Sequence, residues 1–277
     1  MSTARESVFF YTFHKCASTL FSSYVLPNVA GLRHVDYNAQ AAAGTLAHEP
    51  TVEAQGFVYG PIRLSTRGDL PNYEAFRRSV GEPAFVRDRI AVCLVRDPRD
   101  LVISAYYSFG FSHVLSEIPE VRARQEARRA RISAQTIDEF AIEDAPRWVN
   151  AFDAMTVVLD ACPRSVLLRY EDMVGAWPVF ERDLTKYLSF SPSVLREIYD
   201  RSRPRAKEDA GAHKRSGKSG GFRDKLRPET VAELDRVFAP ILARYRFDQP
   251  VPEVELREPP VPLALRMRRL ARALVRR

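Results

Sequence analysis

Short apolar runs alternate with amphipathic segments along most of the chain. The runs at 8–13, 56–63, 90–95 and 166–168 are rich in β-branched or aromatic residues, and they predict buried strands. A further short strand is expected within 31–38. Helical patterns follow at 19–25, 72–80, 101–107, 146–161, 176–188, 191–202 and 228–242, and 113–145 is a charged helical insertion. This alternation predicts an α/β fold with a central parallel β-sheet flanked by helices on both faces.

Polar residues directly follow the first apolar run. His14-Lys15-Cys16-Ala17-Ser18-Thr19 leads from the strand into a helix that should end before Pro27. Such a turn gathers backbone N–H groups and the positive end of a helix dipole, which favour an anion. Lys15 adds a mobile charge, and Ser18 and Thr19 can donate to phosphate oxygens. The glycines usual in phosphate loops are missing, so an ordinary buried strand and turn is the alternative.

A second anion-binding pattern follows the run at 90–95. In Arg96-Asp97-Pro98-Arg99-Asp100, Asp97 suits an N-cap and Pro98 suits the first helical position, so both Asp97 and Asp100 are interpreted as structural caps. Arg96 ends the strand and Ser104 lies about two helical turns later, so the two side chains can hold one anionic group. Ligands of parallel sheets bind at the carboxyl ends of the strands, and Lys15, Arg96 and Tyr170 all follow predicted strands.

Four segments together resemble a known family. They are the Lys15–Thr19 turn, the Arg96–Tyr107 segment, Leu167–Met173, which resembles a Tyr-Glu-Asp-Leu/Met segment, and Arg215–Arg223, which resembles an Arg-Lys-Gly-x-x-Gly-Asp-Trp-Lys loop. Their order is that of the sulfotransferases that use 3′-phosphoadenosine 5′-phosphosulfate (PAPS). The resemblance spans roughly residues 8–247 and implies a P-loop NTPase-like sulfotransferase fold for a domain at 1–249.

The resemblance also implies an activity and residue roles. The chain would transfer a sulfuryl group from PAPS to a hydroxyl or amine and release 3′-phosphoadenosine 5′-phosphate (PAP), with no metal required. Lys15 would act on the leaving oxygen. The residues implied at the 5′-phosphate are Cys16, Ala17, Ser18 and Thr19; those at the 3′-phosphate are Arg96, Ser104, Arg215, Ser216 and Gly217; and those near the adenine are Tyr170 and Phe222.

Some positions depart from the family pattern. His14 replaces proline, Ala17 glycine, Ser216 lysine and Phe222 tryptophan. The general base is also open, because 59–63 lacks the histidine that many relatives carry there. The first candidates are His34 and Asp36, with His34 narrowly favoured; His48 and Glu49 come next, and His14 adjoins Lys15.

Charge is concentrated at the end of the chain. The net charge is +7, but 263–277 carries six arginines and no acidic residue, so the rest is close to neutral and nucleic-acid binding is not indicated. Leu263, Met267, Leu270 and Leu274 form one stripe of a basic amphipathic helix, behind a proline-rich linker that begins at 250. Such a helix suits an anionic membrane surface; docking on the domain or disorder is the alternative.

The cysteines and the termini bear on location. Cys16, Cys93 and Cys162 form an odd set without a C-x-x-C pair, which favours a reducing compartment over a disulfide or zinc framework. No apolar run is long enough to span a bilayer, and the polar start does not resemble a signal peptide. A cytoplasmic location is therefore expected, with peripheral contact at the inner membrane surface through 263–277 left open, as is the oligomeric state.

Competing functions and the acceptor stay open at this point. A nucleotide-dependent kinase of the P-loop class needs G-x-x-x-x-G-K-[ST], which is absent, and a catalytically silent PAP- or membrane-binding protein is the third reading. The aromatic segment 106–111 suits stacking on an acceptor, for which a glycan, a glycolipid or another small metabolite is the expectation. The arginine-rich stretch 122–131 is either a solvated helix face or a basic rim facing an anionic acceptor.

Overall fold

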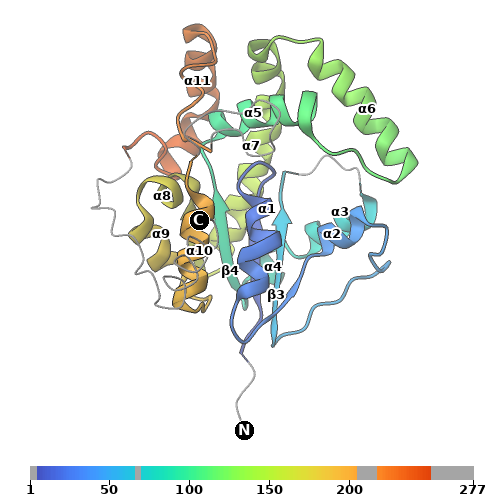
Figure 1. Ribbon diagram of the computed structural model, residues 1–277, viewed down its shortest axis with the longest axis vertical. Helices are drawn as coiled ribbons and strands as arrows, with labels where there is room; N and C mark the ends of the chain where they lie inside the picture. Colours follow the sequence, from blue (N-terminus) through green and yellow to red (C-terminus); the bar gives the residue numbers. More distant parts are fainter. Residues whose placement is uncertain (1–4, 66–69, 205–216, 251–277) are drawn as a thin grey trace, which may run out of the picture.

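A parallel β-sheet forms the centre of the computed structural model, which describes residues 5–65, 70–204 and 217–250 (Figure 1). Within these ranges five strands pair in parallel, in the order β2-β3-β1-β4-β5. Their bounds are β1 (Val8–Thr12), β2 (Arg33–Val35), β3 (Phe57–Arg63), β4 (Ile90–Val95) and β5 (Ser165–Arg169). The predicted parallel α/β sheet is thus confirmed. Arg215, Ser216 and the segment 251–277 lie outside the described residues.

The apolar sequence of β1 follows from burial on both faces of the sheet. All five of its residues are buried, and successive side chains meet different helices. Phe10 stacks on Phe21 with 4.4 Å between ring centroids, whereas Phe13 meets Trp148 edge-on at 6.2 Å. In Figure 1 the first helix accordingly lies in front of the sheet and α7 lies behind it.

Helices connect and cover the strands. The first is α1 (Ser18–Leu20), which continues as the π-helical turn η1 (Phe21–Val25) and the 3₁₀ turn η2 (Leu26–Asn28). The others are α2 (Tyr37–Ala42), α3 (Pro71–Ser79), α4 (Pro83–Val86), α5 (Pro98–Tyr107), the π-helical turn η3 (Ser108–Ser112), α6 (Pro119–Ser133), α7 (Ile137–Ala161), α8 (Tyr170–Gly175), α9 (Trp177–Leu184), α10 (Pro192–Ser202) and α11 (Pro228–Arg244).

The first helix and α7 differ in their bounds from the sequence prediction, and α2, α4 and α8 have no counterpart among the predicted helices. The first helix continues through Pro27, because the proline sits in the first turn of η2, where its missing N–H is not needed. Helix α7 begins well before Pro146, because Thr136 and Glu139 form a capping box at its start. Pro146 therefore lies inside the helix rather than at its beginning.

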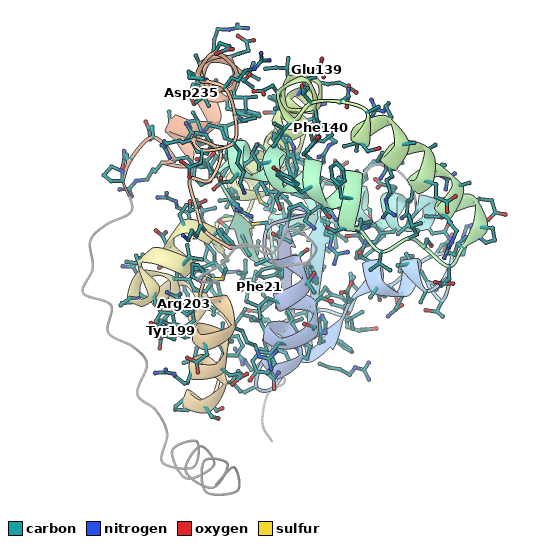
Figure 2. The ribbon with its side chains drawn as sticks, turned by 45° about the horizontal axis from the view of Figure 1, so that its top comes forward. Phe21, Glu139, Phe140, Tyr199, Arg203 and Asp235 are labelled. Carbon is teal, nitrogen blue, oxygen red and sulfur yellow. The ribbon has the colours of Figure 1, made fainter. Side chains whose placement is uncertain are left out.

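Side-chain contacts hold the outer helices in register with the sheet. The rings of Trp177 and Tyr199 meet edge-on at 5.3 Å, and Arg203 donates to the carbonyl oxygen of Val174 over 2.8 Å, so the end of α10, where Figure 2 labels Tyr199 and Arg203, is fixed against α9 and α8. On α11, Asp235 accepts from Arg99 of α5 over 2.6 Å. Because α5 and α8 begin directly after β4 and β5, their first turns lie at the carboxyl edge of the sheet. No helix of the described ranges is long and apolar enough to cross a membrane.

Candidate active site

The turn after β1 adopts a backbone conformation that usually requires glycine. Lys15 and Ala17 have φ angles of +66° and +50°, in the left-handed region. A side chain there costs about 1 kcal/mol relative to glycine. Ala17 nevertheless occupies the position where the family that this chain resembles has glycine, so the turn forms here without a glycine. Ser18 then starts α1 and is buried.

Lys15 is tied to two other elements at this edge of the sheet. Its ammonium group donates to the hydroxyl oxygen of Ser108 over 2.8 Å. Its carbonyl oxygen accepts from Nη1 of Arg96 over 3.1 Å. The turn is therefore fixed to the end of β4 and to the η3 segment that follows α5.

Arg96 lies at the centre of the site. Its guanidinium group lies over the ring of Tyr170, 4.3 Å from the centroid, and Nη2 donates to the carbonyl oxygen of Lys218 over 3.2 Å. Burial alone lowers the pKa of Arg96, but Tyr170, Asp100 and Glu171 raise it overall, so the side chain stays cationic. Its buried Nε atom has no hydrogen-bond partner within the described chain. The cation thus retains a donor for a ligand.

Asp100 connects Arg96 to the glycine-rich segment after residue 216. Its carboxylate is 3% exposed and accepts from the backbone N–H groups of Gly220 and Phe222 over 2.7 and 3.2 Å. Its Oδ2 atom lies 3.8 Å from Nη2 of Arg96. Tyr170 donates to the carbonyl oxygen of Gly217 over 2.7 Å, which fixes the start of the same segment. Asp97 is an N-cap as predicted, but Asp100 also holds this loop over the site, which the sequence did not indicate.

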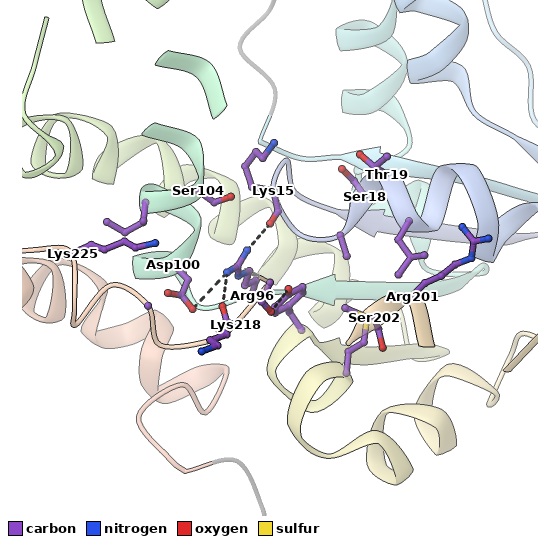
Figure 3. A pocket seen from close by; sticks show the side chains of 17 residues that line it. Lys15, Ser18, Thr19, Arg96, Asp100, Ser104, Arg201, Ser202, Lys218 and Lys225 are labelled. Atoms are coloured by element: carbon purple, nitrogen blue, oxygen red, sulfur yellow. Dashed lines mark hydrogen bonds and ion pairs between the residues drawn. The ribbon is translucent and has the colours of Figure 1, made fainter. Parts of the chain in front are cut away.

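These residues enclose a first cavity of about 180 Å³ (Figure 3). Of the predicted residues it is lined by Lys15, Ala17, Ser18, Thr19, Arg96, Ser104, Tyr170 and Gly217. It is also lined by Lys218, a neighbour of the predicted Gly217, and by Lys225, Arg201, Ser202 and Met173, which sequence reasoning missed. Lysine and arginine outnumber the one acidic lining residue, Asp100, so this cavity favours an anionic ligand.

Two predicted cofactor residues lie beside this cavity rather than in its lining. Cys16 is a buried thiol whose sulfur donates to the carbonyl oxygen of Leu94 over 3.6 Å, and burial raises its pKa to about 12. Phe222 is buried, with the guanidinium group of Arg99 4.3 Å from its ring centroid. Both side chains therefore support the turn and the loop that line the cavity.

A second cavity, of about 420 Å³, lies on the other side of the Lys15 turn. Lys15, Ser18 and Thr19 line both cavities, so they form a shared wall. The second cavity is also lined by His14, Asn38, Arg63, Tyr73, Phe109, Val114 and Arg128. A third cavity of about 300 Å³ shares Leu70, Tyr73 and Val121 with it and extends toward α2, where Ala41 and Leu46 line it. Helix α6 lies on the same side of the molecule as α2 and α3 (Figure 1).

The candidates for the general base differ in whether they line a cavity. Nε2 of His34 lies 2.7 Å from the carbonyl oxygen of Gly60. Asp36 caps α2 by accepting from the N–H group of Ala39 over 2.9 Å, and it also accepts from Ser22. Neither residue lines any of the three cavities, and the exposed His48 and Glu49 do not either. Both first candidates thus make structural hydrogen bonds and line neither of the cavities that Lys15 lines.

His14, in contrast, lines the second cavity. Its backbone N–H donates to the hydroxyl oxygen of Ser65 over 2.8 Å, whereas no hydrogen bond within the described chain involves its ring. Burial, together with the charges of Arg63, His113, Lys15 and Arg147, holds the pKa of His14 well below 6.5. Its imidazole is therefore neutral at pH 7.

Glu171 is a buried carboxyl group beneath the site. It is 4% exposed, and its Oε1 atom accepts from the backbone N–H of Asp97 over 3.0 Å. Its Oε2 atom has no hydrogen-bond partner within the described ranges. Burial raises the pKa of Glu171 to about 7. Among the described residues, no group of three or more histidine, cysteine or acidic side chains could hold a metal ion.

Comparisons with known proteins identify the fold. No protein-family model and no curated protein matches the chain. Among solved structures, it is similar to mouse sulfotransferase SULT7A1 complexed with PAP, with a TM-score of 0.51 and 11% identity over 87% of this chain and 85% of that one. Retinol dehydratase in a complex with retinol and PAP gives a TM-score of 0.40 and 16% identity over 87% and 82% of the two chains. The chain thus has the sulfotransferase α/β fold, as the motif resemblance implied.

Proposed function

We propose that this protein is a PAPS-dependent sulfotransferase, which transfers a sulfuryl group to an acceptor hydroxyl and releases PAP. The observation that carries the proposal is the Lys15 turn, which separates a cation-lined cavity from a second, larger one. Sulfuryl transfer requires in-line placement of donor and acceptor, with positive charge at the leaving phosphate. If the donor binds in the first cavity and the acceptor binds in the second, Lys15 lies between them.

In this proposal, different residues of the first cavity bind different parts of the donor PAPS. Lys15 stabilises charge on the leaving oxygen, while Cys16, Ala17, Ser18 and Thr19 hold the 5′-phosphate through their backbone and hydroxyl groups. Arg96, Ser104 and Gly217 bind the 3′-phosphate in this proposal; the fork of Arg96 and its buried Nε, which has no hydrogen-bond partner in the described chain, support this role. The family resemblance adds Arg215 and Ser216, which lie outside the described residues. Tyr170 bounds the adenine end, and the buried Phe222 supports the loop beside it.

We assign the general base to His14 rather than to His34 or Asp36. A general base must lie within reach of the acceptor hydroxyl and be unprotonated. His14 lines the acceptor cavity next to Lys15, with its ring outside any hydrogen bond of the described chain. The imidazole takes the hydroxyl proton as the acceptor oxygen bonds to sulfur, and the S–O bond to the phosphate breaks with its electron pair on PAP.

The acceptor cavity suits a molecule larger than a simple phenol. It continues into the third cavity at Leu70, Tyr73 and Val121, and Phe109 of the aromatic segment 106–111 lines it. We therefore favour a glycan or glycolipid hydroxyl as the acceptor. Residues 263–277 lie outside the described residues. Their contact with an anionic membrane is therefore a separate proposal, which rests on the sequence pattern alone.

Thermal stabilisation by PAP and by ADP, without metal, tests the donor assignment. A ligand at about one hundred times its dissociation constant adds about 2.7 kcal/mol to the free energy of unfolding. We expect PAP to stabilise the wild type, ADP to do far less, and Arg96→Ala to remove the difference. Arg33→Ala is the matched control, since Arg33 stacks on Phe57 outside the three cavities. Equal stabilisation by ADP, or binding of Mg-ATP alone, would instead support a kinase.

A further inference from the structure

Arg63 is brought to the acceptor cavity by the pairing of β1 with β3. It is the last residue of β3, and its register partner in β1 is Thr12. The next two residues continue the contact, since the N–H of Leu64 donates to the carbonyl oxygen of Thr12 over 2.8 Å and Ser65 accepts from the N–H of His14. Arg63 therefore lies beside His14 and Lys15 in the lining of the second cavity.

The guanidinium group of Arg63 has no counter-charge from the described chain. Its Nε atom is buried without a hydrogen-bond partner, and no ion pair between described residues involves its side chain. The two acidic residues of the same lining contact other arginines: Glu74 lies 2.7 Å from Arg77, and Glu117 lies 3.6 Å from Arg122. Arg147, the neighbouring arginine that contributes to the lowered pKa of His14, has its own carboxylate in Asp144 at 2.7 Å.

An unpaired guanidinium group in such a cavity indicates the chemistry of its ligand. Arg63 as a residue is partly exposed, but its Nε donor is buried, and a buried donor of a charged group is unfavourable unless a hydrogen bond or an opposite charge accompanies it. The planar fork of arginine matches the two oxygens of a carboxylate, sulfate or phosphate. Arg63 does not line the first cavity, so the phosphates of a donor held there do not supply this charge.

We propose that the acceptor carries, besides its reacting hydroxyl, an anionic oxyacid group that binds to Arg63. This inference rests on the proposed sulfotransferase function and narrows its acceptor to a hydroxyl compound such as an acidic sugar. The hydroxyl lies at His14 and Lys15, and the anionic group lies at Arg63 in the same cavity. Arg63 is thus a specificity residue rather than part of the proton transfer.

The test compares three acceptors that differ only at C6 of one sugar. These are methyl β-D-glucoside, methyl β-D-glucuronide and methyl β-D-glucoside 6-phosphate; 4-ethylphenol and 4-hydroxyphenylacetate form a second pair. Calorimetry measures the affinity of each for the PAP-loaded full-length protein, and kcat/KM is measured with PAPS. The variants are Arg63→Gln and Arg63→Lys, with Arg33→Gln as the control outside the cavities.

We expect the wild type and the Arg33→Gln control to prefer an anionic compound over its neutral partner by about 10- to 100-fold, the range for hydrogen bonds to a charged group. Arg63→Gln should abolish that preference, Arg63→Lys should retain part of it, and PAP affinity should not change. The affinities of the glucuronide and of the 6-phosphate show whether a carboxylate or a phosphate fits the cavity better.

Three results overturn the inference. The anionic compounds bind no more tightly than the neutral ones, or their advantage survives Arg63→Gln, or Arg63→Gln slows neutral and anionic acceptors equally, which would assign Arg63 to the sulfuryl group. Failure of the wild type to bind PAP refutes the proposed function itself, and the inference falls with it; this outcome is visible before any acceptor is added.

Discussion

Replacing Glu171 by glutamine should stabilise the protein at alkaline pH and have little effect at acidic pH. The carboxyl group is buried, and only its Oε1 atom has a hydrogen-bond partner among the described residues. Glutamine keeps an oxygen for the N–H of Asp97 and is neutral at every pH. The substitution therefore removes the cost of ionising a buried carboxyl group without changing its shape.

The magnitude follows from the pKa. Burial raises the pKa of Glu171 from 4.5 to about 7. Because the folded-state pKa lies above the unfolded value, the folded state holds its proton more tightly. The stabilisation that this tighter proton binding gives the folded state is complete below about pH 4.5 and is lost as the pH rises through about 7. At about 1.4 kcal/mol per pKa unit, ionisation costs the folded state on the order of 3 kcal/mol by pH 8.

Urea unfolding at pH 5, 6, 7 and 8 measures this difference. We expect Glu171→Gln to be more stable than wild type by about 2–3 kcal/mol at pH 8 and within about 1 kcal/mol of it at pH 5. The control is Glu126→Gln, an exposed position on α6, which should stay within about 0.5 kcal/mol at each pH. A difference between wild type and Glu171→Gln that does not change with pH would refute this reasoning.

Three further predictions concern the site. Asp100→Asn should weaken PAP binding about 10-fold by calorimetry, because two backbone N–H groups lose a charged acceptor; the exposed Asp224→Asn should not, and equal affinities would contradict the role of Asp100. Ser108→Ala should lower the single-turnover transfer rate about 3- to 10-fold by releasing the Lys15 ammonium group, with PAP affinity unchanged and Ser112→Ala as the control; a matching loss of PAP affinity would refute this. His14→Asn should slow transfer to an aliphatic alcohol about 10²- to 10⁴-fold but barely affect a phenol already ionised at the assay pH, whereas equal losses would exclude a general base.

Local patterns in the sequence predicted the sheet and the cavity lined by Lys15 and Arg96. The buried runs of β1 and β4 are continuous, and the residues after them fall at the carboxyl edge because the strands are parallel. Arg96 after β4 and Ser104 on α5, eight residues apart, both line the first cavity, as their spacing predicted. These features depend on residues close together in the sequence.

Features that depend on distant residues could not be predicted in the same way. Asp100 has the sequence signature of a first-turn acid, yet one of its partners, Gly220, lies 120 residues away. Asp36 and His34 have the right chemistry for a base, but the hydroxyl of Ser22 and the carbonyl oxygen of Gly60 engage them. The second cavity joins α2, α3 and α6, and no periodicity in the sequence indicates that these segments meet.

The wall that the two main cavities share also has a thermodynamic consequence. Lys15, Ser18 and Thr19 line both cavities, so a ligand that orders this wall from one side would change what a ligand on the other side encounters. Such coupling is reciprocal: whatever factor the first ligand applies to the affinity of the second, the second applies to the first. Affinities measured separately for the two halves of the site therefore need not equal those in the ternary complex, and their ratio measures the energy that the Lys15 turn transmits.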